Sequence, residues 1–126
     1  MNDHVGLPSE IFRLEKLLQT QFDHWGLTSS ERLEILGHEV PLMCQGQGSE
    51  TALLLTDSDS VERACLLLSI HARLRILFPR NIDLAHSWMK AENRAFQGQT
   101  PTKVACAQGV SGLMKIKRYL ENAANC

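Results

Sequence analysis

The 126-residue sequence lacks the features that mark an enzyme, a metalloprotein or a secreted protein. It contains no GxSxG or HExxH motif, no phosphate-binding P-loop and no Rossmann glycine pattern. Its four cysteines, Cys44, Cys65, Cys106 and Cys126, include no CxxC pair, so their spacing predicts neither a disulfide framework nor a zinc site. The first residues lack the basic-then-apolar pattern of a signal peptide, which predicts a cytoplasmic protein.

Candidate catalytic side chains are also scattered. Asp57 and Asp59 are explained as helix caps rather than as paired catalytic carboxylates. His71 lies among apolar neighbours, as an interior or boundary histidine does. Three further histidines have no partner at ligand or triad spacing: His24, His38 and His86. We therefore expect a protein that is not an enzyme and that uses no metal and no cofactor.

The net charge of −1 hides a strong asymmetry between the two halves of the chain. Residues 1–60 hold three basic and ten acidic side chains, a net charge of −7. Residues 61–126 hold ten basic and four acidic side chains, a net charge of +6. Such asymmetry is informative about partners. A surface that reads DNA needs lysine and arginine to neutralise phosphates, and the first half is poorly supplied with them.

The stretch from Asp57 to Pro79 predicts one long central helix. It opens with capping residues at 56–59 and closes at Pro79, which cannot continue a helix. Between them, apolar residues at helical spacing form two stripes that cover more than half of the wheel, and Cys65 belongs to them as a small core residue. A helix that is apolar on so many sides is normally surrounded by other helices. It is too short and too charged to span a membrane.

Two helices are predicted before it. The spacing of apolar residues from 11 to 25 predicts the first, which ends at Gly26. The order Thr28-Ser29-Ser30-Glu31 has the spacing of a capping box and predicts a second helix that ends at Gly37. The two could be the front of a helix-turn-helix. The next stretch reads as a connection, with one helical turn predicted around 41–44 and another short helix over 50–55.

Three more helices are predicted after Pro79. Asn81 caps a short one, Thr100 and Pro101 begin the next, and the last starts around Ser111. Residues 90–99 read as an ordered loop, and residues 121–126 as a loose polar tail. No strand pattern is present. We predict an all-α fold, a compact helical bundle of about six to eight helices around one long central helix.

The segment from Trp88 to Pro101, WMKAENRAFQGQTP, resembles the signature of the toxin-binding domain of the Xre/MbcA/ParS antitoxin family. The matching residues, in order, are Trp88, Asn93, Phe96, Gly98 and Pro101. The similarity covers about residues 58–122. The sequence departs from the family pattern at Glu92, where proline commonly precedes the asparagine. We divide the chain into an N-terminal helical region, 1–56, with a degenerate Xre-like helix-turn-helix, and a toxin-binding domain, 57–126.

The resemblance implies a function. Members of this family are antitoxins encoded beside a RES-domain toxin that consumes NAD, and they neutralise the toxin by blocking its active site, often with their C-terminal segment. It therefore implies an antitoxin of a type II toxin–antitoxin system, part of a homo-oligomer or of a hetero-oligomer with the toxin. Many members also repress their own operon, so operator DNA is a second possible partner. A general helical interaction module is a third reading.

Two groups of residues carry this hypothesis. The signature residues Trp88, Asn93, Phe96, Gly98 and Pro101 are expected to be structural: core aromatics, a loop brace, a flexible backbone position and a helix start. The basic final helix is the better candidate for contact, although a solvated basic face would explain it equally well. The candidate toxin-binding residues are Arg80, Arg94, Lys115, Lys117, Arg118 and Tyr119.

Overall fold

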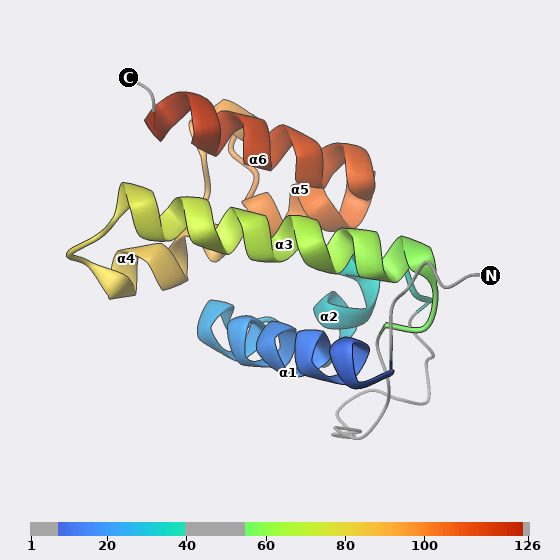
Figure 1. The fold of residues 1–126 in the computed structure, drawn as a ribbon. Coiled ribbons are helices and arrows are strands. Elements are labelled where there is room, and N and C mark those ends of the chain that lie inside the picture. The colour runs from blue at the N-terminus through green and yellow to red at the C-terminus, as the bar shows by residue number, and fades with distance from the viewer. Residues whose placement is uncertain (1–7, 40–54, 125–126) are drawn as a thin grey trace.

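The computed structural model describes residues 8–39 and 55–124, and all regular structure in these two ranges is helical (Figure 1). The α-helices are α1 (Pro8–Trp25), α2 (Ser29–Ile35), α3 (Ser58–Leu77), α4 (Ile82–Ser87), α5 (Pro101–Gln108) and α6 (Val110–Ala124). Two single-turn 3-10 helices, η2 (Trp88–Lys90) and η3 (Arg94–Phe96), lie between α4 and α5. The prediction of an all-α bundle is confirmed.

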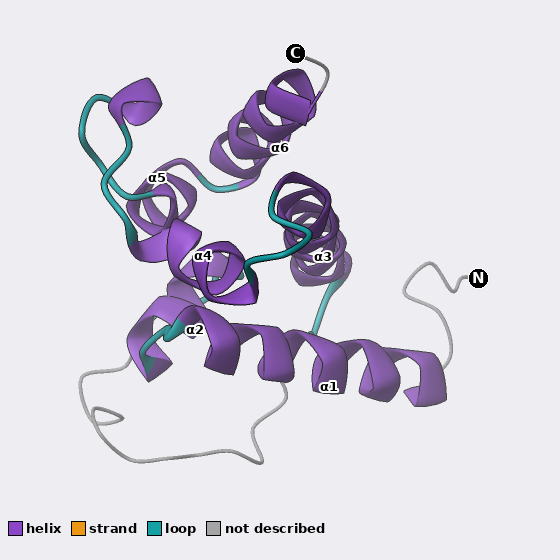
Figure 2. Ribbon diagram, turned by 90° about the vertical axis from the view of Figure 1, so that its left-hand side faces the viewer, coloured by secondary structure: helices purple, strands orange, loops and turns teal. Residues whose placement is uncertain are grey.

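Helix α3 is central, as predicted. It contacts α6 on one side and α1 and α4 on the other. Figure 2 shows α3 close to end-on and α6 running obliquely above it, whereas α1 runs across the view beneath them. Burying apolar side chains at this crossing is the main favourable contribution to the fold. The largest fully buried side chains come from five helices and the residue after α2: Leu18, Phe22, Ile35, Leu36, Leu67, Ile70, Leu74, Val104, Leu113, Ile116 and Leu120, with Met89 from η2.

The predicted helix starts follow from local hydrogen bonds. The Thr28 hydroxyl accepts from the Glu31 N–H at 3.1 Å, and a Glu31 carboxylate oxygen accepts from the Thr28 N–H at 2.8 Å, which completes the capping box of α2. Asp57 caps α3 by accepting from the Ser60 N–H at 2.8 Å. Helix α3 ends at Leu77, two residues before Pro79.

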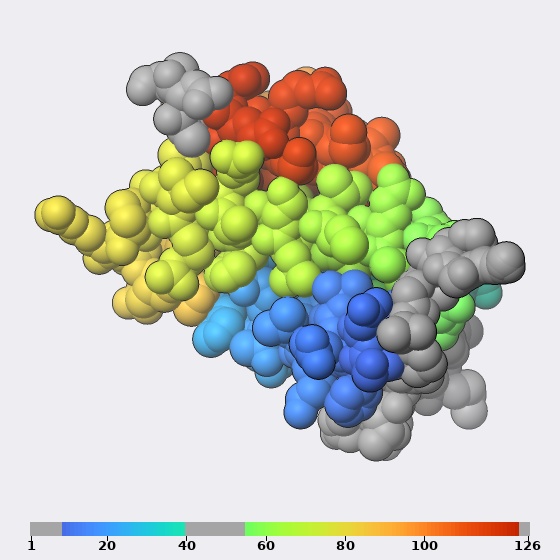
Figure 3. Space-filling view, in the orientation of Figure 1, coloured from blue at the N-terminus to red at the C-terminus, as the bar shows by residue number. Residues whose placement is uncertain are grey.

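The prediction that Cys65 is a core residue is wrong: Cys65 is exposed. It lies on a stripe of exposed residues along α3, together with Ser58, Glu62, Ala72 and Ile76. Figure 3 shows the reason, because α3 is visible along its length between α6 and α1. Two helices on its flanks and α4 near its end leave one face of α3 open to solvent.

The C-terminal segment also differs from the prediction. Residues 121–124, expected in a loose tail, form the last turn of α6. Leu120 is fully buried just before them, and Glu121 lies 3.0 Å from Lys117 and 3.7 Å from Arg73 of α3. A buried anchor and two ion pairs, one to another helix, explain why the helix extends beyond its apolar stripe.

Histidines from three helices meet where α1 ends. The rings of His24 in α1 and His86 in α4 stack with centroids 4.2 Å apart and an interplanar angle of 17°. Burial lowers the pKa of both His71 of α3 and His86, and the positive charge of Arg75 lowers both pKa values further. Sixty-two residues separate the stacked pair, so no local spacing predicts this contact.

The predicted division of the chain at residue 56 stays a prediction. Contacts between α1 and α3 and between α2 and α5 cross that boundary. The helical turn predicted around 41–44 lies outside the described residues. Of the short helix predicted over 50–55, only Leu55 is described, and it is buried. Within 8–39 and 55–124, no helix is long and apolar enough to cross a membrane.

Candidate functional site

Three aromatic side chains from separate elements form one cluster at the C-terminal half of α6. Trp88 of η2 lies 6.2 Å from Tyr119 of α6 with the rings nearly parallel, at 18°. Phe96 of η3 contacts both: its centroid lies 5.5 Å from that of Tyr119 and 6.3 Å from that of Trp88. Phe96 is buried, Trp88 is half-buried and Tyr119 is exposed. The cluster therefore extends from the core to the surface.

A tight loop presents Phe96 to this cluster. The Asn93 side chain accepts from the Ala95 N–H at 2.9 Å, and its backbone oxygen accepts from the N–H groups of Phe96 and Gly98 at 3.0 Å. The loop is closed by a bond from the Asn93 N–H to the Gln99 oxygen. It also needs positive φ at Gln97 (60°) and Gly98 (83°). Asn93 and Gly98 thus have the loop-bracing and backbone roles expected from their residue types.

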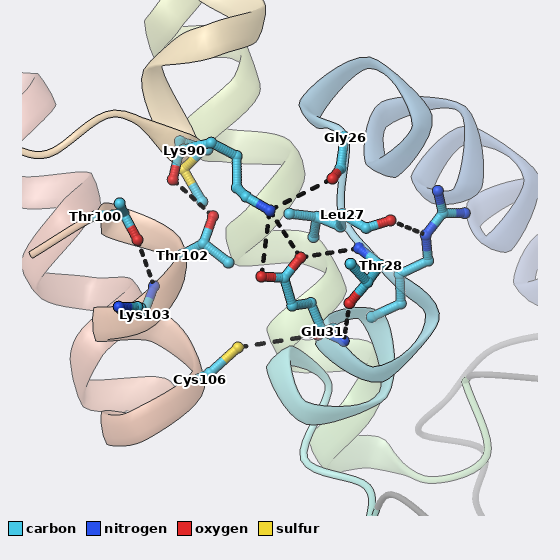
Figure 4. Close-up of polar contacts among 11 residues, drawn as sticks. Gly26, Leu27, Thr28, Glu31, Lys90, Thr100, Thr102, Lys103 and Cys106 are labelled. Atoms are coloured by element: carbon cyan, nitrogen blue, oxygen red, sulfur yellow. Dashed lines mark hydrogen bonds and ion pairs between the residues drawn. The ribbon is translucent and has the colours of Figure 1, made fainter. Parts of the chain in front are cut away.

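Both ends of this loop are fixed to the rest of the bundle (Figure 4). On the α5 side, Pro101 begins the helix, Thr100 caps it, and the buried Thr102 hydroxyl donates to the Met89 oxygen at 2.6 Å. On the η2 side, the Lys90 ammonium lies 2.9 Å from a Glu31 carboxylate oxygen and 3.4 Å from the Gly26 oxygen. These contacts of Lys90 join the segment just before the Asn93–Gln99 loop, called the signature loop below, to the N-terminal helices.

The electrostatics at Glu31 favour its charged form. Burial raises the pKa of this carboxyl, but the hydrogen bond from the Thr28 N–H and the ion pair with Lys90 outweigh burial, and the pKa falls below its ordinary value. One carboxylate therefore caps α2 and also binds η2. This link was not foreseen, because Glu31 and Lys90 are 59 residues apart.

The predicted contact residues of α6 are divided between two sides of the helix. Lys115, Arg118 and Tyr119 are exposed. Lys117 lies on the flank that faces α3, where it pairs with Glu121, and this ion pair lowers the pKa of the Glu121 carboxyl. Lys117 is therefore engaged within the bundle, whereas Lys115 and Arg118 form no ion pair with any residue in the described part of the chain.

The two other predicted arginines lie outside α6. Arg94, in η3, is exposed beside Phe96, and Arg80 is exposed in the turn between α3 and α4. Sequence reasoning missed Leu84 of α4, which is 43% exposed and lies four residues before Trp88. Residues four apart on a helix are surface neighbours, and this spacing is the signal that could have found it.

The Cys106 thiol of α5 is a weak nucleophile, because it stays protonated at neutral pH. Burial, with the charges of Glu34 and Glu31, raises the pKa of the Cys106 thiol to about 11. Its sulfur lies 3.9 Å from the Glu31 backbone oxygen. Over residues 8–39 and 55–124, no three histidine, cysteine, aspartate or glutamate side chains are grouped as metal ligands.

The N-terminal helices offer little basic surface. Arg32 is taken up by an ion pair with Asp23 at 2.7 Å and by hydrogen bonds to Gln19 and Leu27. Arg13 and Lys16 are exposed on α1, and Lys16 lies over the Phe12 ring. DNA binding through this region stays a prediction.

A comparison with protein families identifies the domain. Residues 73–124 match the model of the antitoxin Xre/MbcA/ParS C-terminal toxin-binding domain. The match includes the whole loop from Asn93 to Gln99, the aromatic cluster and α6, and it confirms the family resemblance for this part of the chain. A comparison with curated proteins found no match.

Proposed function

We propose that this protein is the antitoxin of a type II toxin–antitoxin pair, and that it neutralises a RES-domain toxin that consumes NAD by covering the toxin's active site. The observation that carries the proposal is the toxin-binding domain at residues 73–124. Residues 80–126 supply the main contacts. Partial support comes from the surface itself, where bases without ion pairs surround exposed aromatic and apolar side chains.

Occlusion would use the chemistry of α6. A pocket that holds NAD must accommodate an anionic pyrophosphate and aromatic bases. The exposed Lys115 and Arg118 can form ion pairs with acidic groups of such a pocket or donate hydrogen bonds to its polar groups, and Tyr119 can stack where a base would lie. The antitoxin needs no catalytic group for this action, because it excludes the substrate by occupying the space.

The test is co-expression with the product of the neighbouring gene. We expect the neighbour alone to deplete cellular NAD and arrest growth, and this chain to bind it and to restore both. Deletion of α6 is not a clean test, because it removes Ile116 and Leu120 from the core. The double variant Lys115→Glu/Arg118→Glu changes two exposed side chains instead, and should lose protection while keeping its melting temperature.

A neighbour that is harmless, or that does not bind this chain, would overturn the antitoxin proposal. If the wild type binds the toxin and the Lys115→Glu/Arg118→Glu variant protects as fully as the wild type, α6 is not the occluding element. The variant Arg13→Glu, which changes an exposed base on α1, is the matched control and should protect as well as the wild type.

A further inference from the structure

Leu84 and Tyr119 are two of the five exposed large apolar side chains of the matched domain; the other three are Ile76, Ile82 and Met114. Leu84 is 43% and Tyr119 is 38% exposed. The Tyr119 ring stacks on the half-buried Trp88, and Leu84 lies four residues before Trp88, a spacing that puts both on one side of the helical segment. In Figure 2 the η3 loop projects beside α5, across from α6, and the ring contacts of Phe96 with Trp88 and Tyr119 connect these elements. Three separate segments thus build one surface, which consists of Leu84, Trp88, Phe96 and Tyr119.

Basic side chains border this surface. Arg94 is two residues before Phe96 in η3, and Lys115 is one helical turn before Tyr119 in α6. Both are exposed, and neither forms an ion pair within residues 8–39 and 55–124. The other bases of the same domain include Arg73 and Lys117, which share Glu121, and Lys90, which binds Glu31. Arg75, Arg80, Lys103 and Arg118 also form no ion pair within the described residues, so Arg94 and Lys115 are singled out by their positions near Phe96 and Tyr119.

This combination is that of a binding hot spot. Tryptophan, tyrosine and arginine are the residues that most often dominate the energy of an interface. The hydrogen bonds within 93–99 and the anchors at Met89 and Lys90 also fix the loop before any partner arrives. A surface that is already ordered loses less conformational entropy on binding.

We infer that the toxin is held by this aromatic surface between α4, η3 and α6, and that the toxin face it binds is apolar at its centre and acidic at its border. The inference rests on the proposed function, and it adds where the contact is centred and what chemistry the partner presents. Charge complementarity selects the partner face: Arg94 and Lys115 require acids opposite them. The exposed bases of α6, Lys115 and Arg118, then lie at the border of the contact rather than at its centre.

The experiment is a titration of the purified neighbouring gene product with single variants of the full chain. Leu84→Glu places a charge in the centre of the surface, and Arg94→Glu reverses a charge at its border. We expect each to weaken the dissociation constant by roughly tenfold or more, as truncation or reversal at a hot spot does. Raising the salt concentration should weaken wild-type binding more than binding of the Arg94→Glu variant.

Two matched controls make the result interpretable. Leu17→Glu alters an exposed leucine on α1, which is 57% exposed, and Arg13→Glu reverses an exposed arginine on the same helix. Both should bind as the wild type does, and all four variants should keep the wild-type melting temperature within a few degrees because each site is exposed. Leu84 and Arg94 are preferred over Trp88 and Phe96 for this reason.

The outcomes separate the two proposals. If the wild-type chain binds no neighbouring gene product, the antitoxin proposal and the surface both fail. If the wild type binds, but Leu84→Glu and Arg94→Glu bind equally tightly, the antitoxin proposal stands and the aromatic surface is overturned. A loss that is equal for the α1 controls would also overturn it, because the effect would not be specific to this surface.

Discussion

At the scale of single residues, Gly112 decides how closely α5 and α6 can pack. A Cβ atom at this position would lie 2.6 Å from the Val104 backbone oxygen and 2.9 Å from the Gln108 Cβ. The first distance is to backbone, which cannot rotate away. The helices must separate to admit any side chain, and their separation would shift Tyr119 relative to the η3 loop. A residue outside the aromatic surface thus helps to set its geometry.

We expect Gly112→Ala to lower the free energy of unfolding by about 1–2 kcal/mol, since overpacking outweighs the better helix propensity of alanine. Urea denaturation measures the change. Ser111→Ala is the control, because Ser111 is exposed in the same turn and its replacement should alter stability by no more than about 0.5 kcal/mol. A Gly112→Ala protein as stable as the wild type would mean that the contact relaxes at no cost.

At the scale of elements, the histidines at the end of α1 make the contact between α1, α3 and α4 sensitive to acid. The groups that face one another are His24 from α1, His71 and Arg75 from α3, and His86 and Asp83 from α4. Burial lowers the pKa of His71 and of His86, and the neighbouring positive charges lower both further. Asp83 alone acts in the opposite direction, on His86.

Because these pKa values are lower in the folded chain, the unfolded chain binds more protons near pH 6. The stability that His71 and His86 contribute is fully present above the ordinary histidine pKa of 6.5. It is lost as the pH falls through their lower pKa values in the folded chain. We expect the melting temperature to fall between pH 7.5 and 5, and to fall less in His24→Phe/His86→Phe, which keeps a ring pair without its charge. Equal slopes for the two proteins would show that the stack is not responsible.

At the scale of the whole molecule, the charge asymmetry of the chain is partly satisfied internally. The acidic N-terminal helices bind the basic C-terminal half through Glu31 and Lys90, and α2 packs on α5. The N-terminal part also supplies Leu18, Phe22 and Ile35 to the core, all fully buried. Residues 73–124 thus depend on helices outside the range of the family match.

We therefore expect residues 57–126 alone to be much less stable than the whole chain, because the faces of α3 and α5 that α1 and α2 cover would be exposed. Thermal unfolding followed by circular dichroism would show a broad transition at lower temperature, and adding residues 1–56 in trans should sharpen it. A fragment that unfolds as cooperatively and at the same temperature as the full chain would contradict this expectation.

The sequence by itself determined where the main helices lie and how most of them begin. Thr28, Asp57, Asn81 and Thr100 cap helices as predicted, because a cap is a contact between residues two or three apart. The signature loop was likewise recognisable from the order of its residues. Its brace at Asn93 and its positive φ at Gly98 are local properties that the residue types predict.

Only the tertiary structure decided which residues meet across helices. It placed Cys65 on an open face, paired Arg73 with Glu121, stacked His24 on His86 and joined Trp88, Phe96 and Tyr119 into one cluster. These contacts depend on the direction in which each helix packs. Helical spacing shows which face of a helix is apolar, but it does not show which other helix packs against that face. The candidate contact residues were therefore predictable one by one, whereas their grouping was not.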